Sequence, residues 1–251
     1  MRRPRWRLVL SCEHGGHEVP ARWRGCFRGQ ATRLRSHRGW DEGALELARR
    51  LARMLSAPLV ATTTTRLLVD TNRSAGHPAR FSEATRSLPP LERARIVAEH
   101  WAAHRARVEA ALETVMAGGA LAVHVACHSF VPVLRGVARN TDVGLLFEPR
   151  RPREAALAGA WQAALRRRVP GLRVRRNHPY RGVADGLPTA LRRRHADARY
   201  AGIELEVSQA LVRGAPTRWR LVERALGATL LEALDEVIGG RGAPVRAPAR
   251  R

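Results

Sequence analysis

Two short apolar runs of this sequence each end in a histidine, a side chain that often binds catalytic metals. Residues 8–14 read LVLSCEH, and residues 121–128 read LAVHVACH. An apolar run that turns polar at its carboxyl end is typical of a strand that presents functional groups at the edge of an open α/β sheet. Neutral imidazole and carboxylate suit a catalytic zinc ion that keeps one position open for water. We therefore predict that His14 and His128 bind one metal ion, with Glu13 or Glu18 within reach to add a carboxylate.

A third run, residues 203–207, reads IELEV and carries two glutamates. In a strand the side chains alternate between faces, so Glu204 and Glu206 share one face and the apolar residues share the other. A buried carboxylate is costly unless it is paired or functional, and a glutamate beside a metal-activated water is a natural general base. Pairing with a nearby arginine such as Arg199 is the alternative.

Asn72 and Arg73 follow the apolar residues 67–69, where we expect a strand over residues 66–70 to end. An amide beside a guanidinium offers the donors that hold a substrate carboxylate. A cysteine hydrolase with Cys127 as nucleophile and His128 as base is another interpretation. Neighbouring residues of a strand point to opposite faces, which disfavours that pair.

Alternating strands and helices must position these residues. The patterns predict strands over residues 6–12, 58–62, 66–70, 121–127, 143–147, 172–175 and 202–207, and helices over residues 41–55, 90–116, 152–168 and 217–237. Such alternation predicts a single α/β domain with a mixed, mostly parallel sheet flanked by helices. We expect this domain to span residues 1–238 and the Pro/Gly/Arg-rich residues 239–251 to form a disordered tail.

Composition restricts the partners. The chain has 251 residues, 45% of them hydrophobic, which is enough for one large core. Its three cysteines form no CxxC motif, so a reducing cytoplasm fits best, and no apolar run approaches the ~20 residues of a membrane span. The net charge of +23 suggests a polyanion partner, but all 45 basic residues are arginines spread along the chain, which is typical of codon bias. Nucleic-acid binding is therefore the alternative rather than the main interpretation.

Eight motifs occur in an order that resembles the N-formylglutamate amidohydrolase family, over roughly residues 8–210. They are SCEHGG with VP (11–16, 19–20), SHRGWD (36–41), RLLVDTNRS (66–74), HSFVP (128–132), RNTDVGLLF (139–147), RNHPYRG (176–182), DGL (185–187) and GIELEV (202–207).

The resemblance implies a fold similar to the phosphorylase/hydrolase-like fold of zinc carboxypeptidases and hydrolysis of a small anionic N-acyl amino acid such as N-formylglutamate. It implies zinc or another divalent metal at His14 and His128, with Glu13, Asp41 or Glu18 as the third ligand. His17 stands where the related His-x-x-Glu pattern has glutamate. By the same resemblance Glu206 is the base, with Glu204 as the alternative. The substrate-binding residues that we expect are Asn72, Arg73, Arg139, Asn177 and Arg181.

Overall fold

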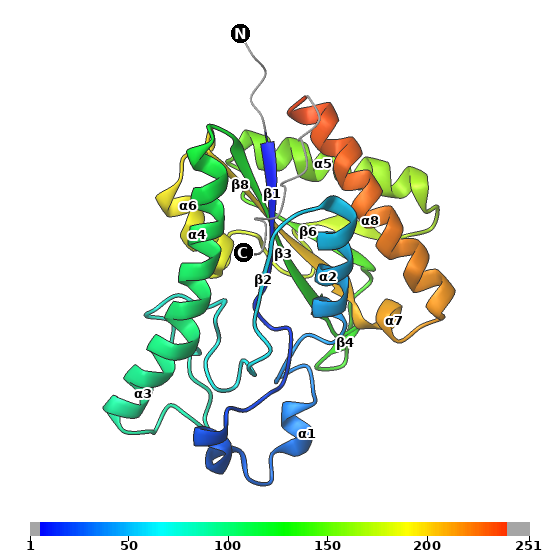
Figure 1. The fold of residues 1–251 in the computed structure, drawn as a ribbon. Helices are drawn as coiled ribbons and strands as arrows, with labels where there is room; N and C mark the ends of the chain where they lie inside the picture. The colour runs from blue at the N-terminus through cyan, green and yellow to red at the C-terminus, as the bar shows by residue number, and fades with distance from the viewer. Residues whose placement is uncertain (1–5, 240–251) are drawn as a thin grey trace.

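The computed structural model describes residues 6–239, which form a single α/β domain around one large sheet (Figure 1). The sheet has six strands in the order β2 (Leu59–Ala61), β1 (Trp6–Cys12), β3 (Leu121–Phe130), β8 (Tyr200–Ser208), β6 (Val143–Leu146) and β7 (Val174–Arg176). Only the β6–β8 pairing is antiparallel in this sheet, and its other pairings are parallel. The expected mixed, mostly parallel sheet is confirmed.

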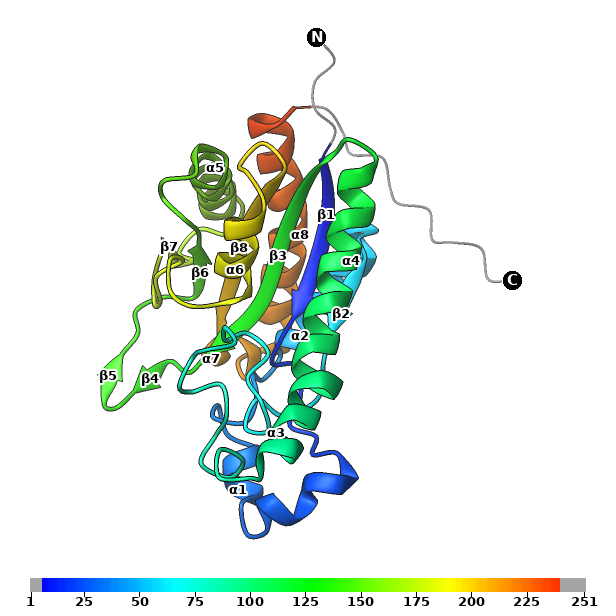
Figure 2. The same ribbon diagram turned by 90° about the vertical axis from the view of Figure 1, so that its left-hand side faces the viewer.

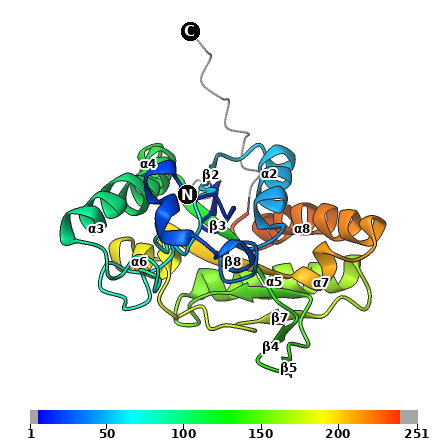
Figure 3. The same cartoon turned by 90° about the horizontal axis from the view of Figure 1, so that it is seen from below.

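Helices cover both faces of the sheet, as Figures 2 and 3 show from two further directions. On one face α2 (Ala44–Leu55), α5 (Pro152–Arg168) and α8 (Pro216–Val237) enclose the larger apolar core, to which β8 contributes Ile203 and Leu205. On the other face α4 (Ala103–Ala117) and α6 (Leu187–Arg194) pack against Val9, Ala122 and Tyr200. The period-two alternation of β8 therefore directs its glutamates away from the larger core and towards the α4/α6 face.

The expected strand over residues 66–70 is wrong. Leu68 N donates to Thr65 O at 3.0 Å, which closes a turn. The apolar side chains Leu67, Leu68 and Val69 are buried in a separate small core with residues of η1 (Ala21–Phe27) and α3 (Pro90–Ile96). An apolar run of this length fits a buried turn as well as it fits a strand.

The helix expected over residues 90–116 is one continuous helical stretch in three parts. It begins as α3, passes through the π-helical η2 (Val97–Ala102) and continues as α4. Pro90 starts it, at a position where the missing N–H leaves no hydrogen bond unmade.

Several short elements were not predicted. They are α1 (Ala31–Leu34), α7 (Gln209–Val212), helices η1 and α6, and a hairpin of β4 (Val133–Leu134) and β5 (Val137–Ala138). Except for Gly239, the tail expected at residues 239–251 lies outside the described residues. Within residues 6–239, no helix combines the length and the apolar character that crossing a membrane requires.

Candidate active site

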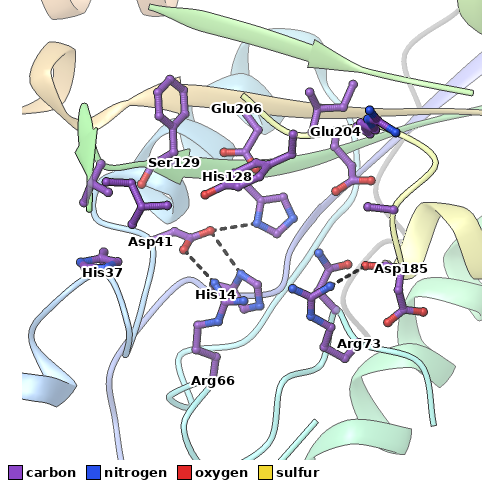
Figure 4. Close-up of a pocket in the computed structure, with 18 residues that line it drawn as sticks. His14, His37, Asp41, Arg66, Arg73, His128, Ser129, Asp185, Glu204 and Glu206 are labelled. Atoms are coloured by element: carbon purple, nitrogen blue, oxygen red, sulfur yellow. Dashed lines mark hydrogen bonds and ion pairs between the residues drawn. The ribbon is translucent and has the colours of Figure 1, made fainter. Parts of the chain in front are cut away.

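A cavity of about 180 Å³ lies at the carboxyl ends of β1, β3 and β8 (Figure 4). Candidate catalytic and binding side chains from four segments that lie far apart in the sequence line it. They are His14, the pair Asn72 and Arg73, His128, and the pair Glu204 and Glu206. The structure therefore brings these four segments together at one edge of the sheet.

His14 and His128 lie beside each other in the cavity wall, with ring centroids 5.0 Å apart. One oxygen of Asp41, Oδ2, lies 3.2 Å from His14 Nδ1 and 2.9 Å from His128 Nδ1. The three side chains are buried and offer ligand atoms within 4.8 Å of one another. Among the described residues this is the group of His, Cys, Asp and Glu side chains that could hold a metal ion.

The far nitrogens of both imidazoles face further buried carboxylates. His14 Nε2 lies 2.7 Å from Asp70 Oδ1, and His128 Nε2 lies 3.2 Å from Glu13 Oε2. An ionised carboxylate only accepts, so each imidazole faces an acceptor at both of its nitrogens, whereas a neutral ring can donate from only one of them. The nitrogen that carries no proton then faces a carboxylate oxygen, and the two would repel each other unless a cation or a second proton lies between them. This donor set fits a divalent metal ion, with Asp70 and Glu13 orienting its ligands.

Charge supports the same conclusion. Burial alone would raise the pKa values of Asp41 and Asp70. The neighbouring His14 and Arg66 outweigh it and hold both pKa values below their usual range, so both carboxylates are ionised. Arg66 lies 3.5 Å from Asp41 Oδ1 and 2.6 Å from Asp70 Oδ2, and Arg73 Nε lies 3.9 Å from the same Asp70 oxygen.

Of the three carboxylates left open as third ligand, Asp41 is the one that lies with His14 and His128 in the group that could hold a metal ion. Glu13 does not line the cavity, and its other oxygen, Oε1, lies 3.2 Å from His104 Nε2. Glu18 is exposed and accepts a hydrogen bond from Thr63 Oγ1 at 2.7 Å. His17, at the position of the related pattern's glutamate, packs its ring against Trp40.

The turn after β1 positions His14. A Cβ on Gly16 would lie 2.4 Å from Thr63 O and one on Gly15 would lie 2.9 Å from Thr62 O, so no larger side chain fits without a shift of the backbone. The backbone N–H of Asp41 donates to His14 O at 2.9 Å. The two glycines thus allow residues 62–63 to approach the turn closely, and the bond to His14 O holds Asp41 beside His14.

Glu206 and Glu204 point into the cavity from β8. Burial raises the pKa of Glu206 to about 8, and burial also raises the pKa of Glu204. Glu206 Oε2 is buried without a hydrogen-bond partner among the described residues. Arg199 donates instead to Met116 O, so the alternative in which this arginine neutralises either glutamate is wrong.

Asn72 and Arg73 line the cavity from the loop that follows the turn, not from a strand end. Asn72 Oδ1 accepts from Leu187 N at 2.6 Å, and Arg73 Nη1 donates to Asp185 O at 3.0 Å. Asp185 Oδ2 accepts in turn from Ser74 N at 2.9 Å. The segment before α6 therefore fixes this pair and leaves part of the Arg73 guanidinium facing the cavity.

Of the other three expected substrate-binding residues, only Arg181 lines the cavity. Arg139 lies 4.8 Å from the centroid of the Tyr180 ring and donates to Tyr180 Oη at 2.8 Å, so it supports a residue that does line the cavity. Asn177 Oδ1 accepts from Phe147 N and Gly182 N, which fixes the loop.

Sequence reasoning missed His104, Asp70 and Arg66 as parts of the site. His104 precedes Val108 and Leu112 at helical spacing, which marks it as a histidine on an apolar helix face. Asp70 and Arg66 lie in the motif RLLVDTNRS (66–74), in which site roles are expected only for Asn72 and Arg73. No local pattern indicates that either lies beside His14.

Cys127 lies on the opposite face of β3 from His128, within the larger core. Burial raises the pKa of its thiol, and the residue does not line the cavity. The arrangement therefore gives no support to a cysteine hydrolase.

Comparisons with known proteins agree with this site. The model of the N-formylglutamate amidohydrolase family matches residues 6–213. The crystal structure of the gene product Atu2144 from Agrobacterium tumefaciens is similar, with 27% identity, a TM-score of 0.79, and coverage of 93% of this chain and 92% of that one. The N-formylglutamate amidohydrolase from Ralstonia eutropha JMP134 shares the fold at 19% identity, with a TM-score of 0.67 over 93% of this chain and 94% of that one.

No curated protein matches the sequence. The family model nevertheless extends from the first described strand to the helix that follows β8, and so includes every side chain of the cavity. This chain belongs to the N-formylglutamate amidohydrolase family and is an amidohydrolase, an enzyme that cleaves carbon–nitrogen amide bonds with water.

Proposed function

We propose that this protein is a metal-dependent amidohydrolase that removes a formyl or other small acyl group from a carboxylate-bearing amino acid, with N-formylglutamate as the reference substrate. The observation that carries the proposal is the buried group of His14, Asp41 and His128 beside Glu206 in one cavity. Family membership supports the amide, and the cavity arginines support an anionic substrate.

His14 Nδ1, His128 Nδ1 and an Asp41 oxygen would hold the cation, for which zinc is our expectation. A divalent ion bound there supplies a Lewis acid that makes water more acidic and stabilises negative charge on the amide oxygen. Asp70 and Glu13 keep the two imidazoles in the tautomers that leave Nδ1 free.

Glu206 acts as the general base in this proposal. It pairs with His128 across β8 and β3, so its carboxylate lies beside the histidine rather than deeper in the cavity. Glu206 takes a proton from the attacking water and passes it to the amide nitrogen as the carbon–nitrogen bond breaks. A carboxyl that lacks a protein hydrogen-bond partner is free to accept and return that proton.

Arg73 and Asn72 bind the substrate carboxylate and thereby set the position of the amide. Arg73 offers the N–H groups that its bond to Asp185 O leaves free, and Asn72 offers its amide N–H groups. Arg181 lies at the exposed rim of the same cavity, where it attracts anions. We further propose a cytoplasmic location, which the three free cysteines support.

Metal analysis of the purified protein, combined with a formate-release assay, tests the proposal. We expect about one divalent ion per chain, bound at one closed set of ligands, and formate or acetate release from at least one member of a panel of N-formyl and N-acetyl amino acids. His128→Ala should lose both metal and activity. His17→Ala is the matched control, because His17 lies outside the metal group and should keep both. Activity that survives exhaustive chelation would overturn the metal-dependent mechanism.

A further inference from the structure

Glu204 is a buried carboxyl that the mechanism above does not use. It is 8% exposed, and it lines the cavity. No hydrogen bond or ion pair to its side chain occurs among residues 6–239. Its oxygens face the cavity rather than a protein donor, so a ligand group that enters the cavity can supply the missing partner.

The location of Glu204 differs from that of the proposed base. Glu206 pairs with His128, whereas Glu204 pairs with Ala126, two residues further from the end of the strand. Two residues of a strand span about 6.6 Å. The backbone of Glu204 therefore lies about that distance further from the carboxyl end of β8 than the backbone of Glu206, which pairs with His128. A Cβ on Gly186 would lie 3.2 Å from Asn72 Oδ1 and 3.6 Å from Glu204 Oε1, which places Glu204 beside Asn72.

The end of the cavity that should bind the substrate carboxylate therefore contains a carboxyl of its own. Arg73 offers a guanidinium and Asn72 offers amide N–H groups, while Glu204 offers an acceptor that neither of them satisfies (Figure 4). A substrate end that is only negative would pair with Arg73 and would offer no donor to Glu204. An end that carries an ammonium beside its carboxylate would pair with both.

We propose that Glu204 is a specificity-determining residue that selects substrates with an ammonium group beside the carboxylate bound by Arg73. Such a zwitterionic end is a free α-amino acid head group, so the amide that is cleaved lies on the side chain. The substrate class is an amino acid with a formylated or acylated side-chain amine. Water adds to the acyl carbon, the carbon–nitrogen bond breaks, and the products are a carboxylic acid and a diamino acid. This inference rests on the proposed amidohydrolase function.

A pair of substrates that differ only in the α-ammonium tests the inference. Nδ-Formyl-L-ornithine carries the ammonium and 5-formamidopentanoate lacks it, and both release formate. For the metal-loaded wild type we expect kcat/KM to be at least about tenfold higher for the zwitterion, as one buried charge-assisted hydrogen bond provides. Glu204→Gln should lower that ratio by at least about tenfold. Glu206→Gln is the control, because loss of the base slows both substrates and leaves their ratio unchanged.

The outcomes separate this inference from the proposed function. A wild-type ratio of one or less overturns the role of Glu204, and so does a ratio that Glu204→Gln leaves unchanged. Formate from Nα-formylglutamate but not from the zwitterion overturns the inference and leaves the amidohydrolase function intact. If no substrate turns over, calorimetric titration of the Glu206→Gln protein with both compounds still decides, since tighter binding of the zwitterion is expected. Equal binding would overturn the inference, and a melting curve of Glu204→Gln shows whether that variant is folded.

Discussion

At the scale of single residues, Asp41 contacts the imidazoles of both His14 and His128. Its Oδ2 lies within 3.2 Å of both Nδ1 atoms, and each imidazole has a second carboxylate behind it. Burial would lower the pKa of His128, but the hydrogen bonds and charges of Asp41 and Glu13 raise it well above its ordinary value. Without a metal ion, a proton on His128 therefore takes the place of the cation in this negatively charged group.

The carboxylate behind His14 should matter for metal affinity. Asp70→Asn keeps the shape of the side chain and removes the negative charge beside Nε2, so we expect metal affinity to fall by about 10–100-fold. Competition with a chromophoric chelator measures this change. Glu18→Gln is the matched control, because Glu18 is exposed and contacts Thr63 instead. Equal affinity of both variants would show that Asp70 does not orient His14.

The proposed base and the proposed anchor should have different kinetic signatures. Glu206→Gln should lower kcat by roughly 10²–10⁴ with little change in metal content, because it removes a proton acceptor. Arg73→Ala should mainly raise KM, because it removes a charge-assisted contact with the substrate. Steady-state kinetics on one cleaved substrate separates the two effects. A large fall in kcat for Glu204→Gln together with none for Glu206→Gln would move the base to Glu204.

The raised pKa of Glu206 should also appear in the stability of the metal-free protein. In the unfolded chain this carboxyl ionises near its reference value of 4.5, and in the folded chain near about 8. The unfolded state therefore releases the proton first, so the free energy of unfolding falls as the pH rises from about 4.5 to 8. Urea titrations at several pH values should show a smaller fall for Glu206→Gln than for the wild type. Parallel pH profiles of the two proteins would contradict the raised pKa.

At the scale of elements, the sequence predicted the strands that carry the site better than it predicted the loops. β1 and α5 begin and end at the expected residues, and the alternation in β8 correctly assigned Glu204 and Glu206 to one face. Periodicity reports which side of an element is buried. It does not report what the element packs against, so the apolar residues 67–69 fit the expected strand as well as they fit the buried turn that the structure shows over residues 66–68.

The direction of β6 could not be predicted for the same reason. Its four residues are buried throughout, as they would be in either orientation. Likewise, His14, Asp41 and His128 come from three separate segments of the chain. A single sequence does not show how far apart such segments lie in the folded protein. The resemblance kept Asp41 among the possible ligands, and the geometry then separated it from Glu13 and Glu18.

A buried ion pair connects three elements around the site. Arg192 of α6 donates through Nε to both oxygens of Glu154 in α5, and its Nη2 donates to Gly202 O in β8. Glu154 Oε1 also accepts from Gly202 N, so the pair fixes the strand that carries Glu204.

Arg192→Ala should therefore be strongly destabilising. The variant leaves the Glu154 carboxylate buried without its cation, a loss that typically costs about 3–5 kcal/mol. Urea unfolding measures this loss. Arg193→Ala, on the exposed side of the same helix, should change the free energy of unfolding by less than about 0.5 kcal/mol. Similar values for the two variants would show that the pair contributes little.

At the scale of the whole molecule, the large positive charge is distributed over many elements. Exposed or partly exposed arginines pair with acids at separate places, including Arg22 with Glu92, Arg33 with Glu83, Arg194 with Glu109 and Arg213 with Glu42. Pairs of this kind reduce the local field without forming a single basic face.

We therefore expect only weak binding to nucleic acid. Fluorescence anisotropy with a short DNA duplex should show affinity that falls steeply with salt and no saturable tight site at about 0.15 M ionic strength, because such binding is purely electrostatic. A sub-micromolar dissociation constant at that salt concentration would support the polyanion alternative, whereas addition of the duplex should leave amidohydrolase turnover unchanged under our proposal.

Because β6 runs antiparallel to β8, the segment between β3 and β6 can vary in length beside the cavity. β3 ends at the edge of the sheet that carries the cavity, and β6, being antiparallel to β8, begins at that same edge. The chain between Phe130 and Val143 therefore leaves and re-enters the sheet without crossing it, and the β4–β5 hairpin occupies this excursion. Insertions or deletions there would change the wall beside Leu134 without altering any strand pairing of the large sheet. The hairpin is thus a natural place to exchange segments between relatives when the aim is to change the shape of the cavity.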